Sequence, residues 1–179
     1  MPKETTRKSD KRLIIISAIT LAVIIVFGFV FYKIIEPKPF EASEKIALQS
    51  EYKNTDGAQL ELRKLAESED KVTEYFENIR AEKKDFVLYV SLPICNGDAA
   101  KFKEFVLDFQ RKNHVSFYYL TSDYVKETSI YETVKFFPSV IIFKDGKIAN
   151  YLKYDSDEDK EFYKTYEGFE KWIRANVEF

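Results

Sequence analysis

A run of 20 residues without a charge, from Leu13 to Tyr32, constrains this chain more than any other feature. It reads LIIISAITLAVIIVFGFVFY and lies between Arg12 and Lys33. A helix of this length spans roughly 30 Å, which is the thickness of the hydrocarbon core of a bilayer. No small-x-small cleavage site follows the run, so an uncleaved anchor is favoured over a secretory signal. We therefore expect a transmembrane anchor over residues 13–35.

The charges on either side of the run predict its orientation. Five basic residues precede it, whereas only Lys33 and Lys38 follow closely. Because short cytoplasmic flanks carry the excess of Lys and Arg, we expect residues 1–12 to form a cytoplasmic basic tail and the C-terminal part to be extracytoplasmic. Residues 37–179 carry 22 basic and 27 acidic residues, a net charge of -5. This part has no electrostatic attraction to anionic lipid.

Composition excludes several classes of function. One cysteine and one histidine exclude an internal disulfide framework and the usual zinc sites. The acidic run that begins at Asp155 starts like a calcium loop. However, Lys160 stands where that loop requires glycine, and Tyr166 stands at its twelfth position. We expect no metal and no cofactor, and the absence of a basic patch makes nucleic acid an unexpected partner.

The segment after the anchor carries no pattern of chemical interest. Pro37 and Pro39 close the anchor, and a turn signal follows at residues 54–57. The stretches around that turn are polar and weakly helical. We interpret residues 36–70 as a stalk or spacer.

From Lys71 onward, strand and helix patterns alternate. Residues 85–91 (DFVLYVS) and 115–121 (VSFYYLT) are apolar runs typical of buried strands. Asp145-Gly146 between two further strands predicts a β-hairpin over 140–151. Apolar residues also recur at helical spacing, which predicts a helix in each of three segments. These residues are Val72, Tyr75, Phe76 and Ile79; Ala99, Phe102, Val106 and Phe109; and Tyr166, Phe169, Trp172, Ile173 and Val177.

This order predicts an α/β three-layer sandwich over residues 71–179. The sheet is expected to be mixed, parallel where a helix makes the crossover and antiparallel at the hairpin. Helices are expected to cover both of its faces.

Three features in this order resemble the thioredoxin superfamily. A cysteine follows the first strong strand and opens a helix in Pro93-Ile94-Cys95-Asn96-Gly97-Asp98, Phe137-Pro138-Ser139 leads into a later strand, and a hairpin follows at residues 143–147. With the expected anchor, the chain is most similar to anchored thioredoxin-like proteins of Gram-positive bacteria, such as bacteriocin-transport accessory proteins. The resemblance implies a thioredoxin-like fold for residues 71–179.

The resemblance also implies roles for individual residues. Cys95 would be the nucleophile, Pro138 the cis proline that orients a protein client, and Asp98 a modifier of the thiol. The remaining residues of the two motifs would bind the client: Pro93, Ile94, Asn96, Gly97, Phe137 and Ser139.

Three positions depart from the family pattern. Asp98 stands where the family has its second cysteine, Ile94 where a tryptophan is common, and Tyr89 where a buried acidic residue assists proton transfer. A helix N-terminus favours a thiolate at Cys95, but the carboxylate of Asp98 disfavours it. A single cysteine cannot complete the two-cysteine cycle unaided.

Two functions therefore remain open at this point. One is a single-cysteine thiol–disulfide accessory factor for the folding or export of a secreted or membrane client. The other is a redox-inactive adaptor that binds protein partners in an envelope complex. His114 is expected at the opposite end of its strand from Cys95, on the surface. Tyr118, Tyr124 and Tyr131 are candidates to widen a binding surface near the cysteine.

Overall fold

The computed structural model describes residues 45–66, 68–94 and 96–179. The chain divides into two compact units, residues 1–41 and residues 42–179, and the described residues belong to the second. The expected anchor over 13–35 lies outside the described residues, and so does Cys95. Among the described residues, every helix is too short or too polar to cross a bilayer.

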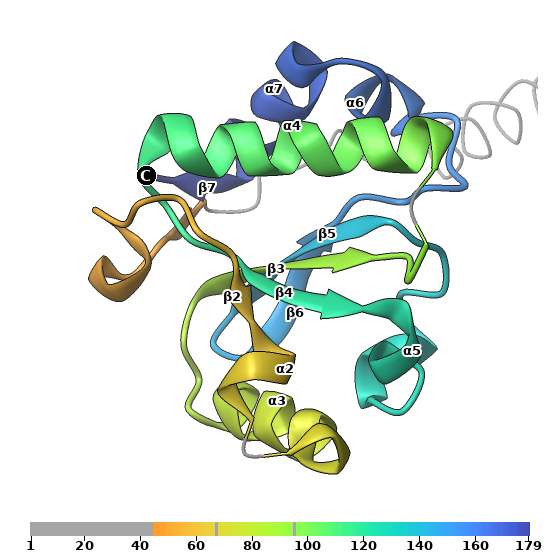
Figure 1. Ribbon diagram of the computed structural model, residues 1–179. Coiled ribbons are helices and arrows are strands. Elements are labelled where there is room, and N and C mark those ends of the chain that lie inside the picture. Colours follow the sequence, from red (N-terminus) through yellow and green to blue (C-terminus); the bar gives the residue numbers. More distant parts are fainter. Residues whose placement is uncertain (1–44, 67, 95) are drawn as a thin grey trace, which may run out of the picture. The chain divides into compact units, whose positions relative to one another are not determined.

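The centre of this unit is a five-stranded mixed sheet (Figure 1). Its strands lie in the order β2 (Leu60–Glu61), β4 (Tyr118–Thr121), β3 (Phe86–Ser91), β5 (Ser139–Lys144) and β6 (Lys147–Tyr151). β2 and β3 run parallel to β4, whereas β5 is antiparallel to both β3 and β6. This confirms the predicted mixed sheet with a hairpin at its edge.

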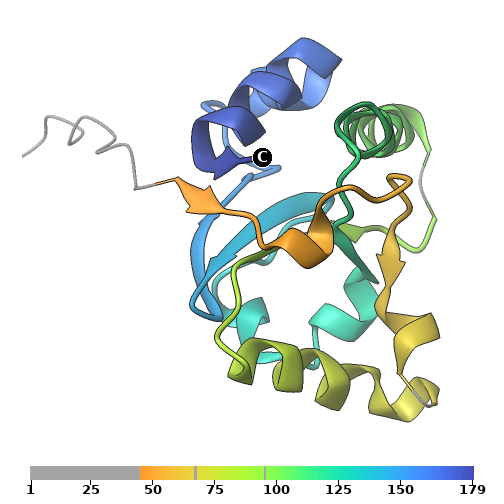
Figure 2. The same ribbon diagram turned by 90° about the vertical axis from the view of Figure 1, so that its left-hand side faces the viewer.

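Helices cover both faces of the sheet, as predicted (Figure 2). One face carries α4 (Gly97–Asn113), α6 (Lys160–Lys164) and α7 (Tyr166–Asn176). The other carries α2 (Leu62–Leu65), α3 (Val72–Ala81) and α5 (Ser122–Val125). The described residues also form 3-10 turns: η1 (Ser50–Tyr52), η2 (Glu69–Lys71) and η3 (Ser129–Glu132).

Aromatic side chains fill both layers of the core. All six residues of β3 are buried, which is why that strand reads as a continuous apolar run. On the α3 face, Phe86 stacks on Phe143 with ring centroids 4.5 Å apart. On the α4 face, Phe169 meets Phe102 and Phe109 edge-to-face at 5.4 Å and 5.7 Å. Such pairs add to the free energy gained from area burial alone.

Residues 46–66 differ from the predicted spacer because they fold onto the domain. β1 (Ile46–Ala47) pairs in parallel with β7 (Val177–Glu178), and β2 forms one edge of the central sheet. Five side chains of this segment are buried: Ile46, Leu48, Tyr52, Leu62 and Ala66. The domain therefore begins well before residue 71. Strands of two residues have no alternation of polarity that could reveal them in the sequence.

The hairpin between β5 and β6 is held against the end of α3. Gly146 has a φ of +72°, and an added Cβ would collide with the carbonyl of Arg80. The Arg80 Nε donates to the Gly146 carbonyl at 3.2 Å, and its guanidinium lies over the Phe143 ring at 5.7 Å. Glycine is required here by both the backbone conformation and the close approach.

Candidate functional site

Two loops that carry the predicted site residues leave the sheet at the same end. β3 and β5 are antiparallel neighbours, with Val90 opposite Ser139. The chain that follows β3 and the chain that precedes β5 therefore emerge side by side. Pro93 and Ile94 lie on the first of these loops and are exposed. Cys95 itself lies outside the described residues, between Ile94 and the helix α4.

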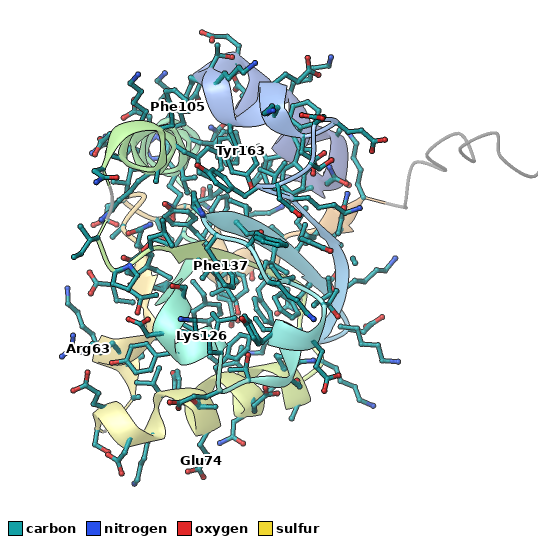
Figure 3. The ribbon with its side chains drawn as sticks, turned by 90° about the vertical axis from the view of Figure 1, so that its right-hand side faces the viewer. Arg63, Glu74, Phe105, Lys126, Phe137 and Tyr163 are labelled. Atoms are coloured by element: carbon teal, nitrogen blue, oxygen red, sulfur yellow. The ribbon has the colours of Figure 1, made fainter. Side chains whose placement is uncertain are left out.

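The second loop contains a cis peptide bond between Phe137 and Pro138, as the resemblance implied. Phe137, Pro138 and Ser139 are buried. The Tyr163 hydroxyl donates to the carbonyls of Pro138, at 3.0 Å, and Leu152, at 3.1 Å. The Ser139 hydroxyl also donates to the Leu152 carbonyl, at 2.8 Å. Tyr163 thus holds the proline loop from the helical layer above it; Figure 3 looks onto this end and labels Tyr163 and Phe137.

Tyr163 can hold this loop because it stays protonated. Burial is the main cause that raises the pKa of Tyr163, and the nearby carboxylate of Asp159 raises it further. The hydroxyl therefore remains a donor throughout the neutral pH range. Sequence reasoning missed this residue because α6 is only one turn long and follows an acidic run.

The first turn of α4 is open to solvent. Asn96 has extended backbone, and its side chain makes no capping hydrogen bond. Gly97 has a φ of +54° and lies in open space. Asp98 is exposed in the first turn, as predicted, and its carboxylate lies 3.7 Å from the Lys101 ammonium. The negative charge of Asp98 is therefore partly offset by Lys101 and by the helix N-terminus.

Tyr89 occupies the core at the position where the resembled family has an acidic residue. It is fully buried and packs against Phe102 and Tyr119, with ring centroids 6.1 Å and 5.8 Å away. The aromatic surroundings suit a tyrosine and would penalise an ionised carboxylate. Position 89 therefore supplies no carboxylate that could assist proton transfer at this end of the sheet.

Exposed apolar side chains gather around the two loops. Ile94 is 82 % exposed, Phe136 is 53 % exposed and Tyr154 is 40 % exposed. Ile94 precedes Cys95, Phe136 precedes the cis proline segment, and Tyr154 follows β6. Large apolar side chains left in solvent around one end of a domain are typical of a surface that binds protein.

A groove lies between the start of α4 and α6. It has a volume of about 460 Å³ and is lined by Asp98, Lys101, Tyr154, Lys160, Tyr163 and Lys164. Tyr163 lines this groove and also donates the hydrogen bond that holds the proline loop. Sequence reasoning did not find the groove, because it brings together residues of two helices far apart in the chain.

Other candidates from the sequence lie elsewhere. His114 is exposed at the C-terminal end of α4, a helix of 17 residues and therefore roughly 26 Å long. His114 is thus on the surface, as predicted, and lies at the far end of α4 from Gly97. Tyr118 packs against Phe86, toward the start of β3, and Tyr124 donates to Glu69 at 2.5 Å. Tyr118 therefore lies away from the two loops. Tyr124 belongs to α5, which follows the end of β4, and Tyr131 is partly buried against the core. The part of these last two residues in a binding surface stays a prediction.

No protein-family model matches the chain, and neither does any curated protein. Among solved structures, the chain is similar to a mutant thioredoxin from Halobacterium salinarum, with 12 % identity, a TM-score of 0.41, and coverage of 70 % of this chain and 96 % of that one. It is also similar to thioredoxin O1 from Arabidopsis thaliana, with 12 % identity, a TM-score of 0.43, and coverage of 67 % and 98 %. It is similar as well to a thioredoxin from Plasmodium falciparum, with 17 % identity, a TM-score of 0.40, and coverage of 56 % of this chain and 91 % of that one.

The thioredoxin-like fold of this chain rests on its own features. They are the mixed sheet, the helices on both faces, the helix that starts after β3, the cis proline before β5 and the hairpin that follows.

Proposed function

We propose that this chain is a membrane-anchored, extracytoplasmic thioredoxin-like protein of a bacterium. It acts as a single-cysteine thiol–disulfide accessory factor for the folding or export of a secreted or membrane client. The observation that carries the proposal is that the loop through Phe137 and Pro138 leaves the sheet beside the loop that leads to Cys95. The apolar run from Leu13 to Tyr32 and its basic flank support the anchor over residues 13–35 and its orientation.

The chemistry is a thiol–disulfide exchange. The Cys95 thiolate attacks one sulfur of a client disulfide, a mixed disulfide forms, and the other client sulfur leaves as a thiolate. A second thiolate of the client then attacks the mixed disulfide and releases Cys95, so the client is isomerised without net oxidation. An external small thiol can release Cys95 in the same way, and it then remains joined to the client sulfur in a new mixed disulfide. A second small thiol attacks that disulfide, so the client is reduced to two thiols and the two small thiols leave as their own disulfide. No second cysteine of this chain takes part, because it has none.

The described residues suit parts of this cycle. The proline loop is rigidly supported by Tyr163 and Ser139, and exposed apolar side chains surround it. Asp98 lies in the first turn of α4, where its charge opposes a thiolate nearby. We therefore expect a slower nucleophile than the N-terminal cysteine of a two-cysteine site.

A redox-inactive adaptor remains the second candidate. It is favoured by Tyr89, which is buried among aromatic rings where a proton-transfer carboxylate would be needed, and by Asp98 at the position of a resolving thiol. In this function the exposed end of the sheet binds an envelope partner without exchange at Cys95.

A gel experiment separates the two functions. Cells that express the chain are quenched with acid, free thiols are blocked, and non-reducing gels compare the wild type with Cys95→Ser. Thiol exchange predicts reductant-sensitive adducts in the wild type alone, and assignment is direct because Cys95 is the single cysteine. A free, slowly alkylated thiol without adducts would exclude the exchange function and leave the adaptor.

A further inference from the structure

The outer strand of the central sheet, β6, has one side without a neighbouring strand. Among the described residues, β6 pairs with β5 on one side and with no strand on the other. Such an edge offers a row of N–H and C=O groups with which a strand of a second copy can pair. Two copies that met edge to edge at β6 would join their sheets through a symmetric contact. The residues around β6 determine whether this contact can form.

The register of β5 and β6 identifies the backbone groups that point outward. The Leu152 amide donates to the Val140 carbonyl at 3.0 Å. The preceding residue, Tyr151, lies opposite Ile141. Residues of an antiparallel pair alternate between positions that exchange hydrogen bonds with the partner strand and positions that face away from it. The amides of Tyr151 and Lys153 are therefore directed away from β5, toward the place of an added strand.

Side-chain acceptors occupy both of these outward amides. The Tyr151 amide donates to Asn150 Oδ1 at 2.8 Å. The Lys153 amide donates to Asp159 Oδ2 at 2.7 Å. The carbonyl of Lys153 is also used, because it accepts from the Ser156 amide at 3.1 Å. An incoming strand would have to break these hydrogen bonds before it could pair, so the gain from pairing would be largely offset.

Asn150 is held in the orientation that its contact requires. Its Nδ2 donates to Asn176 Oδ1 at 2.7 Å, and Asn176 Nδ2 donates to the Trp172 carbonyl at 2.8 Å. Because an amide side chain has one acceptor oxygen and one donor nitrogen, these bonds leave the Asn150 oxygen for the Tyr151 amide. Asn176 is buried at the end of α7. The helix α7 therefore fixes one of the two groups that close the edge.

The first half of β6 is irregular. Asn150 and Ile148 lie opposite consecutive residues of β5, so Ala149 between them is an extra residue. A β-bulge of this kind disrupts the ladder locally and increases the twist of the strand. Lys147, at the start of β6, is exposed. Bulges and lysine side chains are both features that protect sheet edges from pairing.

We propose that Asn150 and Asp159 block the β6 edge, so that two copies of this chain cannot join their sheets there. The two side chains occupy the outward amides of Tyr151 and Lys153, and the bulge disturbs the rest of the strand. This inference goes beyond the proposed function and does not depend on it, because it involves neither the cysteine nor the proline loop. Loss of the two acceptors should convert the edge into a contact between copies.

The test compares the purified full-length wild type with the double variant Asn150→Val, Asp159→Ala, in a detergent whose density is matched by the solvent. Valine keeps a residue that favours a strand at position 150. Sedimentation equilibrium measures the dissociation constant for self-association. We expect the double variant to associate at least about tenfold more tightly than the wild type, because two outward amides become available. Equal association of the two proteins would overturn the proposal.

Two further variants separate edge pairing from other causes of association. Glu158→Gln removes one negative charge from the same acidic run, as Asp159→Ala does, and should associate like the wild type. Adding Lys153→Pro to the double variant removes one of the released amides, and proline is tolerated where an edge N–H faces solvent. This addition should restore weak association. A proline variant that associates as tightly as the double variant would overturn the proposal.

Amide hydrogen exchange followed by NMR measures the two contacts directly, and single variants suffice for it if the double variant does not fold. The Leu152 amide, which is bonded within the sheet, is the internal reference. Relative to it, the Tyr151 amide should exchange at least about tenfold faster in Asn150→Val than in the wild type, and the Lys153 amide should do so in Asp159→Ala. Unchanged relative rates would overturn the proposal, since the two side chains would then not hold these amides.

Discussion

At the scale of single residues, Tyr163 connects the helical layer to the proline loop. We predict that Tyr163→Phe lowers the free energy of unfolding by about 1–3 kcal/mol, because the Pro138 carbonyl loses its donor inside the protein. Urea unfolding followed by the fluorescence of the single tryptophan, Trp172, measures this change. Tyr154→Phe is the matched control, since that residue is 40 % exposed, and it should change stability by less than about 0.5 kcal/mol. Equal losses in both variants would contradict a special role for the Tyr163 hydroxyl.

At the scale of elements, the segment from β1 to α2 completes the domain. We predict that a chain starting at residue 42 unfolds cooperatively, whereas one starting at residue 71 does not fold. The shorter chain loses all five buried side chains of this segment, and four of them are large: Ile46, Leu48, Tyr52 and Leu62. At roughly 1.5–3 kcal/mol each, this loss matches the whole stability of a typical domain, about 5–15 kcal/mol. Near-ultraviolet circular dichroism and urea unfolding compare the two chains, and matching midpoints would refute the prediction.

Element length also explains what the sequence could predict of the fold. β3 and α4 are long enough for their apolar run and stripe to identify them, and Asp145-Gly146 identified the hairpin. β1, β2 and β7 have two residues each, and their pairing depends on partners far away in the chain. Their burial is therefore a tertiary effect that no local period records.

In the candidate site, too, residues of local motifs were predictable from the sequence, whereas features that depend on tertiary packing were not. Asp98 and Pro138 were predictable because they belong to short motifs whose spacing resembles a known family. The groove between α4 and α6 was not predictable, because Lys101 and Lys164 line one groove only after α6 packs beside α4. The support of the proline loop by Tyr163 depends on the same packing.

At the scale of the whole molecule, buried tyrosines predict a loss of stability in alkali. Burial is the main cause that raises the pKa of both Tyr52 and Tyr163 in the folded state. In the unfolded chain the same hydroxyls ionise near pH 10. Above that pH the folded state binds more protons than the unfolded state, so the free energy of unfolding falls as pH rises. The limit is about 1.4 kcal/mol per pH unit for each tyrosine.

Urea unfolding at a series of values between about pH 8 and about pH 11 measures this slope, while tyrosinate absorbance reports ionisation. The double variant Tyr52→Phe, Tyr163→Phe should begin less stable at neutral pH, since it loses the hydrogen bonds to Tyr118, at 3.3 Å, and to the Pro138 carbonyl. Its stability should then fall less steeply with pH, because two buried groups no longer need to ionise. An unchanged slope in the variant would mean that these hydroxyls titrate alike in the folded and unfolded chains. The alkaline loss would then have to come from other groups, such as Lys84, whose pKa is raised by its pairing with Glu82 and Glu51 and whose contribution is also lost as pH rises.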